Sequence, residues 1–247
     1  MKKNLKEILG KQILFFDGGT GTVLQEWGLK PGEFSENWNL SHPEKIQQLH
    51  YEYYKAGANI IKTNTFGALS IKFPLNLEKI ITSAIQNANN ARNQIQKENQ
   101  TSDKNEYFIA YDISSTGKLL KPLGDLDFED AVNIFKKSFN IALKQNIDCI
   151  LIETMNDGYE TKAAVLAAKE SLQENKIDLP IFVTNVYDSD SRLLSGATPE
   201  SMVAMLEGLG VDAIGINCSL GPEQMLPVVS QLSKVSSLPI IVNPNAG

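Results

Sequence analysis

Apolar and polar positions alternate along this chain with two different periods. Short apolar runs, typical of buried strands, cover residues 13–16, 59–62, 107–111, 149–152, 181–183, 213–216 and 240–242. The longer segments between them repeat apolar residues every three or four positions, which is typical of helices that bury one face. These helical segments cover residues 43–56, 77–96, 128–145, 159–172, 199–209 and 222–235.

Regular alternation of strands and helices predicts a parallel sheet covered by helices, of the α/β class. Two architectures compete, an open doubly wound sheet and a TIM-type barrel of eight strand–helix units. An open sheet concentrates its polar chemistry at one switch point, whereas nearly every strand of this chain runs into polar residues. The pattern therefore favours a (β/α)8 barrel. We expect residues 1–247 to form one barrel domain, truncated after the seventh strand, so that the last helix, the eighth strand and the closing helix are absent.

Composition excludes several classes of protein. The formal net charge is −6 and the basic residues are scattered, which argues against a nucleic-acid partner. No run of apolar residues is long enough to cross a membrane, and the N-terminal segment has no apolar signal region. The two cysteines, Cys149 and Cys218, do not form a disulfide framework. A reducing, cytoplasmic location is expected.

Candidate chemistry gathers where strands end. After residues 13–16 comes Asp17-Gly18-Gly19-Thr20-Gly21-Thr22, whose glycines leave backbone amides free to meet an anion. The same stretch is also typical of a tight turn between a strand and a helix, and it matches neither common phosphate-binding pattern.

Glu153 follows the fourth strand, and a carboxylate there suits an ammonium group or general-base work. A salt-bridged glutamate at the start of a helix is an equal alternative. Asp112 and Asn185 follow other strands and are equally ambiguous. Both histidines, His42 and His50, fall near the first long helix, where a solvent-exposed or capping role is expected.

Cys218 is the thiol at a strand exit, next to Asn217, whereas Cys149 lies within an apolar run and is expected to pack in the core. A lone cysteine is more often buried filler than a ligand. Zinc needs three or four protein ligands, and neither CxxC nor HExxH spacing is present. From the residues alone, we expect a barrel whose mouth binds an amine and an anion beside one exposed thiol, with the reaction left open.

Five segments together give a more specific indication. FDGGTGTVLQ near the start, IIKTNTFGA after the second strand, LIETM after the fourth, GINCSLGPEQMLP after the sixth and PNAG at the end follow one another in the order of a known family. On these motifs, over essentially its whole length, the chain resembles the homocysteine S-methyltransferase family. The resemblance is strongest to the homocysteine-binding N-terminal domain found in its cobalamin-dependent members, the methionine synthases.

The resemblance implies a barrel enzyme that transfers a methyl group to the thiolate of homocysteine and forms methionine. It implies a zinc ion held by three cysteine thiolates, the first of which corresponds to Cys218, with Asn217 beside the metal. It places the amino and carboxylate groups of homocysteine at Asp17, Gly18, Gly19 and Glu153. The two threonines after the second strand, Thr63 and Thr65, are weaker candidates for lining the pocket.

This chain departs from the family's pattern at its end. The other two zinc thiolates of the family are adjacent cysteines in a Gly-Gly-Cys-Cys-Gly motif after the eighth strand, and no such motif occurs in the 247 residues. We therefore expect the chain to be a piece of a longer protein and to be inactive alone. Methylcobalamin, supplied by another domain or chain, is the favoured methyl donor, and folate- and cobalamin-binding domains are expected beyond the fragment.

Two other functions remain open at this point. The chain is alternatively a non-catalytic, amino-acid-binding or accessory remnant of the same fold. It is less well described as an unrelated barrel enzyme, such as an aldolase or a phosphate-binding isomerase, because such an enzyme needs a lysine at a strand tip or a glycine-rich loop after the seventh strand. Lys62 is the one candidate, and the pattern places it inside a strand.

Overall fold

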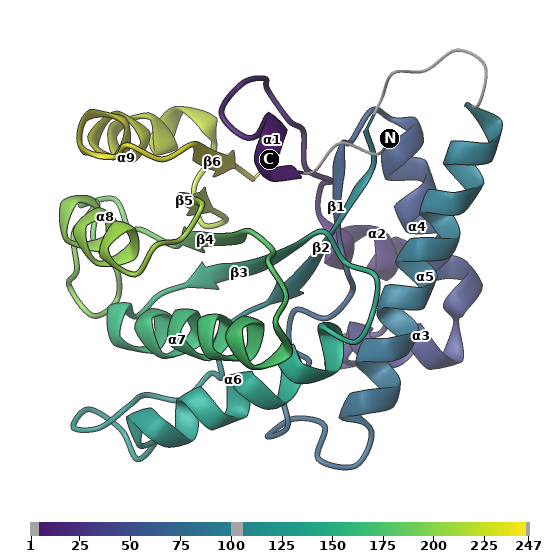
Figure 1. Cartoon of the computed structure of the whole chain (residues 1–247), viewed down its shortest axis with the longest axis horizontal. Helices are drawn as coiled ribbons and strands as arrows, with labels where there is room; N and C mark the ends of the chain where they lie inside the picture. The colour runs from purple at the N-terminus through teal and green to yellow at the C-terminus, as the bar shows by residue number, and fades with distance from the viewer. Residues whose placement is uncertain (1–4, 100–105, 246–247) are drawn as a thin grey trace.

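The computed structural model describes residues 5–99 and 106–245 of the chain. Its elements alternate in the expected order (Figure 1). They are α1 (Leu5–Ile8), α2 (Thr20–Glu26), the 3-10 helix η1 (Ser35–Asn37), α3 (Trp38–Ser41), α4 (Pro43–Lys55), β1 (Ile60–Lys62), α5 (Leu77–Glu98), β2 (Phe108–Ile113), α6 (Phe128–Ala142), β3 (Cys149–Met155), α7 (Gly158–Asn175), β4 (Ile181–Asn185), α8 (Pro199–Gly208), β5 (Ala213–Asn217), α9 (Pro222–Val235) and β6 (Ile240–Asn243).

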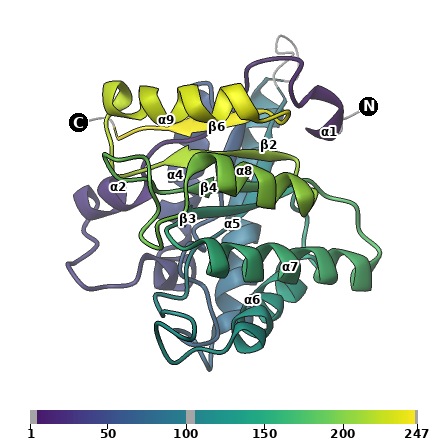
Figure 2. The ribbon, with the colours of Figure 1, turned by 90° about the vertical axis from the view of Figure 1, so that its left-hand side faces the viewer.

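The six strands form one parallel sheet in the order β1-β2-β3-β4-β5-β6. A doubly wound sheet reverses its strand order at a switch point, and this sheet does not. Successive helices from α5 to α9 contact one another along the outside of the curved sheet (Figures 1 and 2). The fold is therefore a partial TIM-type barrel, as the sequence predicts.

Side chains alternate between the two faces of the sheet, as the strand period requires. Ile109, Tyr111 and Ile150 face the helices in the larger core cluster. Phe108, Cys149 and their neighbours on the other strands form a second cluster on the inner face. Cys149 is completely buried there, which confirms its predicted role in core packing.

The predicted first strand is wrong in its extent. Residues 13–16 contribute only one isolated bridge, between Phe16 and Ile60, beside the edge of β1. The segment has a described neighbour on one side only, and Ile13 is 80% exposed, so little apolar burial supports a longer ladder. The bridge nevertheless fixes the next residue, because the Asp17 N–H donates to the Ile60 carbonyl at 2.9 Å.

Helix starts follow their capping residues. Proline occupies the first turn of α4, α8 and α9, where its missing N–H has no intrahelical partner to lose. Asp157 caps α7 by accepting a hydrogen bond from the Glu160 N–H. These turns hold the loops at the carboxyl ends of the strands, where the polar residues of the sequence collect.

Candidate functional site

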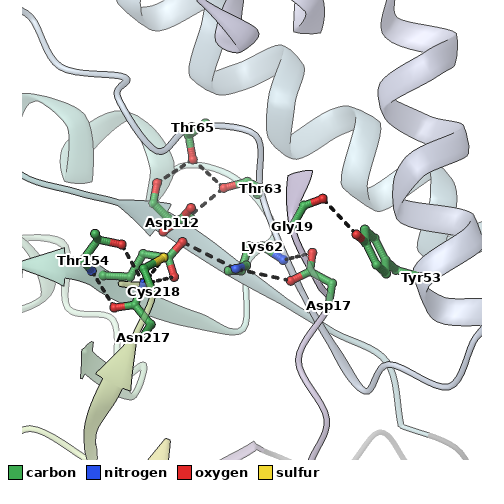
Figure 3. A network of polar contacts seen from close by, with 11 residues as sticks. Asp17, Gly19, Tyr53, Lys62, Thr63, Thr65, Asp112, Thr154, Asn217 and Cys218 are labelled. Carbon is green, nitrogen blue, oxygen red and sulfur yellow. Dashed lines mark hydrogen bonds and ion pairs between the residues drawn. The ribbon is translucent and has the colours of Figure 1, made fainter. Parts of the chain in front are cut away.

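A pocket of about 410 Å³ lies at the carboxyl ends of the strands. Figure 3 shows the polar contacts among residues at these strand ends. All six predicted site residues line the pocket, namely Asp17, Gly18, Gly19, Glu153, Asn217 and Cys218. Five of the described strands, β2 to β6, run one or more residues further than the apolar pattern indicated. Asp112, Glu153, Asn185 and Asn217 therefore lie within the last residues of their strands rather than after them.

The glycine-rich turn leads from the first bridge into α2 and lies against Tyr53. The Tyr53 hydroxyl donates a 3.0 Å hydrogen bond to the Gly19 carbonyl. A Cβ atom on Gly18 would lie 3.0 Å from the same hydroxyl, so this position has little room for a side chain. The turn is thus held close to α4 and leaves Asp17 aimed into the pocket.

An ammonium group lies between buried carboxylates in the floor of the pocket. Lys62 Nζ is 3.6 Å from Glu153 Oε1 and 3.9 Å from Asp17 Oδ1. Asp17, Glu153 and the neighbouring Asp112 are each at most 5% exposed. The Lys62 backbone N–H also donates to Asp17 Oδ2 at 2.9 Å, so β1 binds this carboxylate directly.

Burial and mutual repulsion change the proton affinities of these groups. Burial raises the pKa of Asp17 to about 7, against the opposing influence of Lys62. Burial also raises the pKa of Asp112 well above its usual range, and the adjacent Glu153 adds to this rise. For Lys62, burial lowers the pKa, but Glu153, Asp17 and Asp112 together outweigh burial, and the pKa rises. Lys62 is therefore a cation at neutral pH.

Asn217 joins the ends of β5 and β3. Its Nδ2 donates to Thr154 Oγ1 at 2.6 Å and to Glu153 Oε2 at 3.4 Å, and its Oδ1 accepts from the Thr154 N–H at 3.1 Å. The same amide lies 3.3 Å from Cys218 Sγ. Asn217 thus sets the positions of a carboxylate and a thiol together.

The thiol of Cys218 is exposed at the pocket. Cys218 and Ser219 both have positive φ, at 56° and 61°, and Thr154 has a φ of 58°. Non-glycine residues in this region store strain and cluster at functional sites. The Cys218 N–H donates to the Asn243 carbonyl at 3.1 Å, which ties the strained turn to the end of β6.

Among the described residues, the pocket supplies one side chain that suits zinc, the thiol of Cys218, and not a complete set of ligands. An exposed thiol suits zinc, but no group of three or more histidine, cysteine, aspartate or glutamate side chains in the described ranges is placed to hold a metal ion. No chemical step through a metal is therefore derived from these residues.

Several predictions about individual residues need correction. Lys62, assigned to a strand interior, ends β1 and lines the pocket. His50, expected to be exposed or capping, is completely buried, whereas His42 does occupy the N-cap position of α4. Thr63 lines the pocket, and Thr65 lies behind it, where its hydroxyl donates to the Asp112 carbonyl.

Three further residues that were not predicted as site residues, Thr154, Asn243 and Asn245, also line the pocket. Each is typical of an ordinary turn by itself, although Thr154 lies in the motif LIETM and Asn245 in the motif PNAG. The family motif at residues 244–247 is described only for Pro244 and Asn245, because Ala246 and Gly247 lie outside the described residues. No helix in the described ranges is both long and apolar enough to cross a membrane.

Comparison with known proteins identifies the family. The family described as Homocysteine S-methyltransferase matches residues 14–247. Methionine synthase of Mycobacterium leprae is 30% identical over 251 residues, and that of Mycobacterium tuberculosis is 28% identical. Each match covers 99% of this chain and 21% of the relative, so the chain spans about a fifth of the curated proteins it matches.

A solved structure shares the fold. The metallated form of the homocysteine methyltransferase MmuM from Escherichia coli superposes with a TM-score of 0.82 at 24% identity. The match covers 98% of this chain and 87% of that chain. With the family match over nearly the whole sequence, it follows that this chain belongs to the homocysteine S-methyltransferase family.

Proposed function

We propose that this chain binds homocysteine at the pocket and presents its sulfur for methylation to methionine. The proposal rests on one observation: carboxylates and an exposed thiol line the same pocket in a member of this family. Asp17 and Glu153 offer negative charge to the amino group, and Cys218 offers a thiol on the side of the reacting sulfur. Asn217 holds Glu153 and Cys218 in place through its amide.

The proposal assigns Cys218 as one thiolate ligand of zinc, with the remaining ligands coming from outside the described residues. Bound zinc keeps a thiol deprotonated near neutral pH, which makes its sulfur nucleophilic. The chain's own contribution is to bind and orient the amino acid. Methylcobalamin from another domain or chain is the proposed methyl donor, as the similarity to methionine synthases suggests. A cytoplasmic location stays a prediction.

Binding without catalysis is the second candidate for the chain by itself. It is favoured by the finding that no group of three metal-ligating side chains occurs in the part of the chain that the structure describes. We therefore propose that the 247-residue polypeptide binds the amino acid but forms no methionine. Methionine formation by this polypeptide with zinc and methylcobalamin would contradict that assignment.

The aldolase alternative is disfavoured by the charge on Lys62. A lysine that forms a Schiff base needs a lowered pKa, because the neutral amine is the nucleophile. The surrounding carboxylates instead raise the pKa of Lys62. Its ammonium is held in the charged form that cannot attack a carbonyl.

Titration calorimetry with L-homocysteine under reducing conditions tests the proposal. We expect binding of one molecule per chain, and affinity at least about tenfold lower in Glu153→Gln, since tenfold corresponds to about 1.4 kcal/mol and a charge-assisted hydrogen bond contributes more. Glu129→Gln, which removes an exposed carboxylate from α6, is the matched control and should bind normally. An absence of binding, or equal binding by Glu153→Gln and the control, would refute the proposed site.

A further inference from the structure

Lys62 is the one basic side chain among the described residues that line the pocket. The acidic residues of the lining are Asp17, Glu36, Asp112 and Glu153. An acidic pocket attracts the ammonium group of an amino acid and repels its carboxylate. A ligand that carries both charges is therefore bound better where the lining also offers positive groups, either the backbone amides of the glycine-rich turn or a cation.

The Lys62 ammonium is close to anions without being hydrogen-bonded to them. Its nearest carboxylate oxygens lie at 3.6 and 3.9 Å, and no hydrogen bond from Nζ to another described residue meets the usual distance limit. By contrast, Lys136 on α6 contacts two glutamates at 2.7 and 2.9 Å. The Lys62 ammonium is therefore ion-paired rather than hydrogen-bonded among the described residues, and a ligand oxygen can accept a hydrogen bond from it.

The backbone keeps this ammonium in the pocket. Lys62 is the last residue of β1 and pairs with Ala110 of β2. Its side chain is 14% exposed and forms ion pairs with Asp17, beside which Figure 3 shows it, and with Glu153 of β3. The cost of burying an ammonium is compensated by these anions, so it remains charged and nearly fixed at the floor of the pocket.

We propose that Lys62 is the specificity-determining residue of the pocket, where its ammonium binds the α-carboxylate of the ligand and selects amino acids over amines that lack this group. The inference rests on the proposed function, because it takes the ligand to be an amino acid. Asp17 and Glu153 then serve the ligand's ammonium group. The alternating charges of the pocket match the two opposite charges of a zwitterion.

A competing account gives Lys62 only the task of neutralising its neighbours. In that account its removal frees Asp17 and Glu153, and all ligands with an ammonium group bind more tightly. The two accounts are separated by a pair of ligands that differ in the carboxylate alone. L-Methionine and 3-(methylthio)propylamine form such a pair, and neither has a thiol that oxidises or requires a metal.

Titration calorimetry on the full chain gives the dissociation constant of each ligand. The dissociation constant of the amine divided by that of the amino acid measures the selectivity for the carboxylate. We expect Lys62→Met to reduce this ratio at least about tenfold, the change that the loss of a charge-assisted hydrogen bond produces. Lys62→Arg should largely keep the ratio. Lys79→Met, which removes an exposed lysine of α5, should leave it unchanged. Lys62→Gln supplies a second neutral variant if Lys62→Met does not fold.

Two results would overturn the inference and leave the proposed function standing. One is a ratio in Lys62→Met or Lys62→Gln within about twofold of the unmodified chain. The other is tighter binding of both ligands by these variants. If the unmodified chain binds neither methionine nor homocysteine, the proposed function falls together with the role of Lys62.

Discussion

The side chains of Asn217 and Thr154 are joined by a 2.6 Å hydrogen bond from the amide to the hydroxyl, which connects the ends of β5 and β3. Thr154 has a φ of 58°, a conformation that costs a non-glycine residue about 1–3 kcal/mol. Asn217 also stabilises this conformation by accepting a second hydrogen bond, from the Thr154 N–H to its Oδ1. Since Glu153 precedes Thr154, the direction of the pocket carboxylate depends on an amide from another strand.

Replacement of Asn217 by alanine should weaken both stability and binding. Asn217 is 2% exposed, and its removal leaves the part-buried N–H of Thr154 without this partner, at a cost of about 1–3 kcal/mol in the free energy of unfolding. Urea unfolding measures this loss. Methionine affinity, measured by calorimetry, should fall with it, because Glu153 is no longer held.

Asn175→Ala is the control for the loss of Asn217. Asn175 is exposed and also donates through its amide, to Asn140 and to the Ser171 carbonyl. Its replacement should cost less than about 1 kcal/mol and leave binding intact. Equal destabilisation by the two variants would show that Asn217 has no special part in the site.

Ligand binding should strengthen as pH rises through neutrality. Because burial raises the pKa of Asp17 to about 7, this carboxyl is largely neutral at pH 6 and largely ionised at pH 8. Ionised Asp17 attracts the ammonium of methionine, which stays protonated over this interval. We expect affinity to rise about threefold to tenfold from about pH 6 to 8 in calorimetric titrations.

Asp17→Asn should abolish most of that rise. It should also stabilise the chain at about pH 8, because the raised pKa means that ionisation of Asp17 costs folding free energy as pH increases from about 4 to 7. A pH profile of affinity that is the same in the variant and the unmodified chain would assign the titration to another group.

The sequence predicts the elements of the fold more completely than it predicts the residues of the site. The range of α9 is predicted to the residue, since Pro222 and the apolar repeat mark a local pattern. Glu153 and Cys218 line the pocket as predicted, but the apolar runs before them left a salt-bridged glutamate and a core cysteine open, and the family motifs decided the prediction. Lys62 is missed, because one polar residue at the end of an apolar strand does not reveal that three carboxylates from other parts of the chain lie around it.

His50 is a second residue whose surroundings the sequence pattern did not reveal, and it leads to a third prediction. It lies on the inner side of α4, completely buried, and neither ring nitrogen has a hydrogen-bond partner among the described residues. Burial lowers the pKa of His50 to about 4 from an ordinary value of 6.5. As pH falls below 6.5 the unfolded chain takes up a proton that the folded chain refuses, so stability decreases down to about pH 4.

The variant His50→Leu should remove this dependence. The stability difference between His50→Leu and the unmodified chain should be constant above about pH 7 and should shift by about 3 kcal/mol in favour of the variant by about pH 4. Urea unfolding at a series of pH values measures it. Parallel stability curves for the two proteins would mean that His50 is not held neutral by burial.

Gly215 and Gly208 form a pair of glycines for which the same substitution should have opposite effects. Gly215 pairs with Ile241 between β5 and β6, and a Cβ atom built on it would lie 1.9 Å from the Ile241 carbonyl oxygen. Because the obstacle is backbone, no side chain can move aside, and Gly215→Ala should cost more than about 3 kcal/mol. Since β5 carries Asn217 and Cys218 into the pocket, methionine binding should be lost as well.

Gly208 ends α8, and a Cβ atom there meets nothing within 4 Å. Gly208→Ala should therefore stabilise the chain by about 0.5 kcal/mol, because alanine restricts the unfolded chain and glycine in a helix is unfavourable. Urea unfolding of the two variants in parallel makes the comparison. A mild effect of Gly215→Ala, similar in size to that of Gly208→Ala, would mean that β6 is not held against β5 in this register. The placement of Asn217 and Cys218 in the pocket would then lose its structural basis.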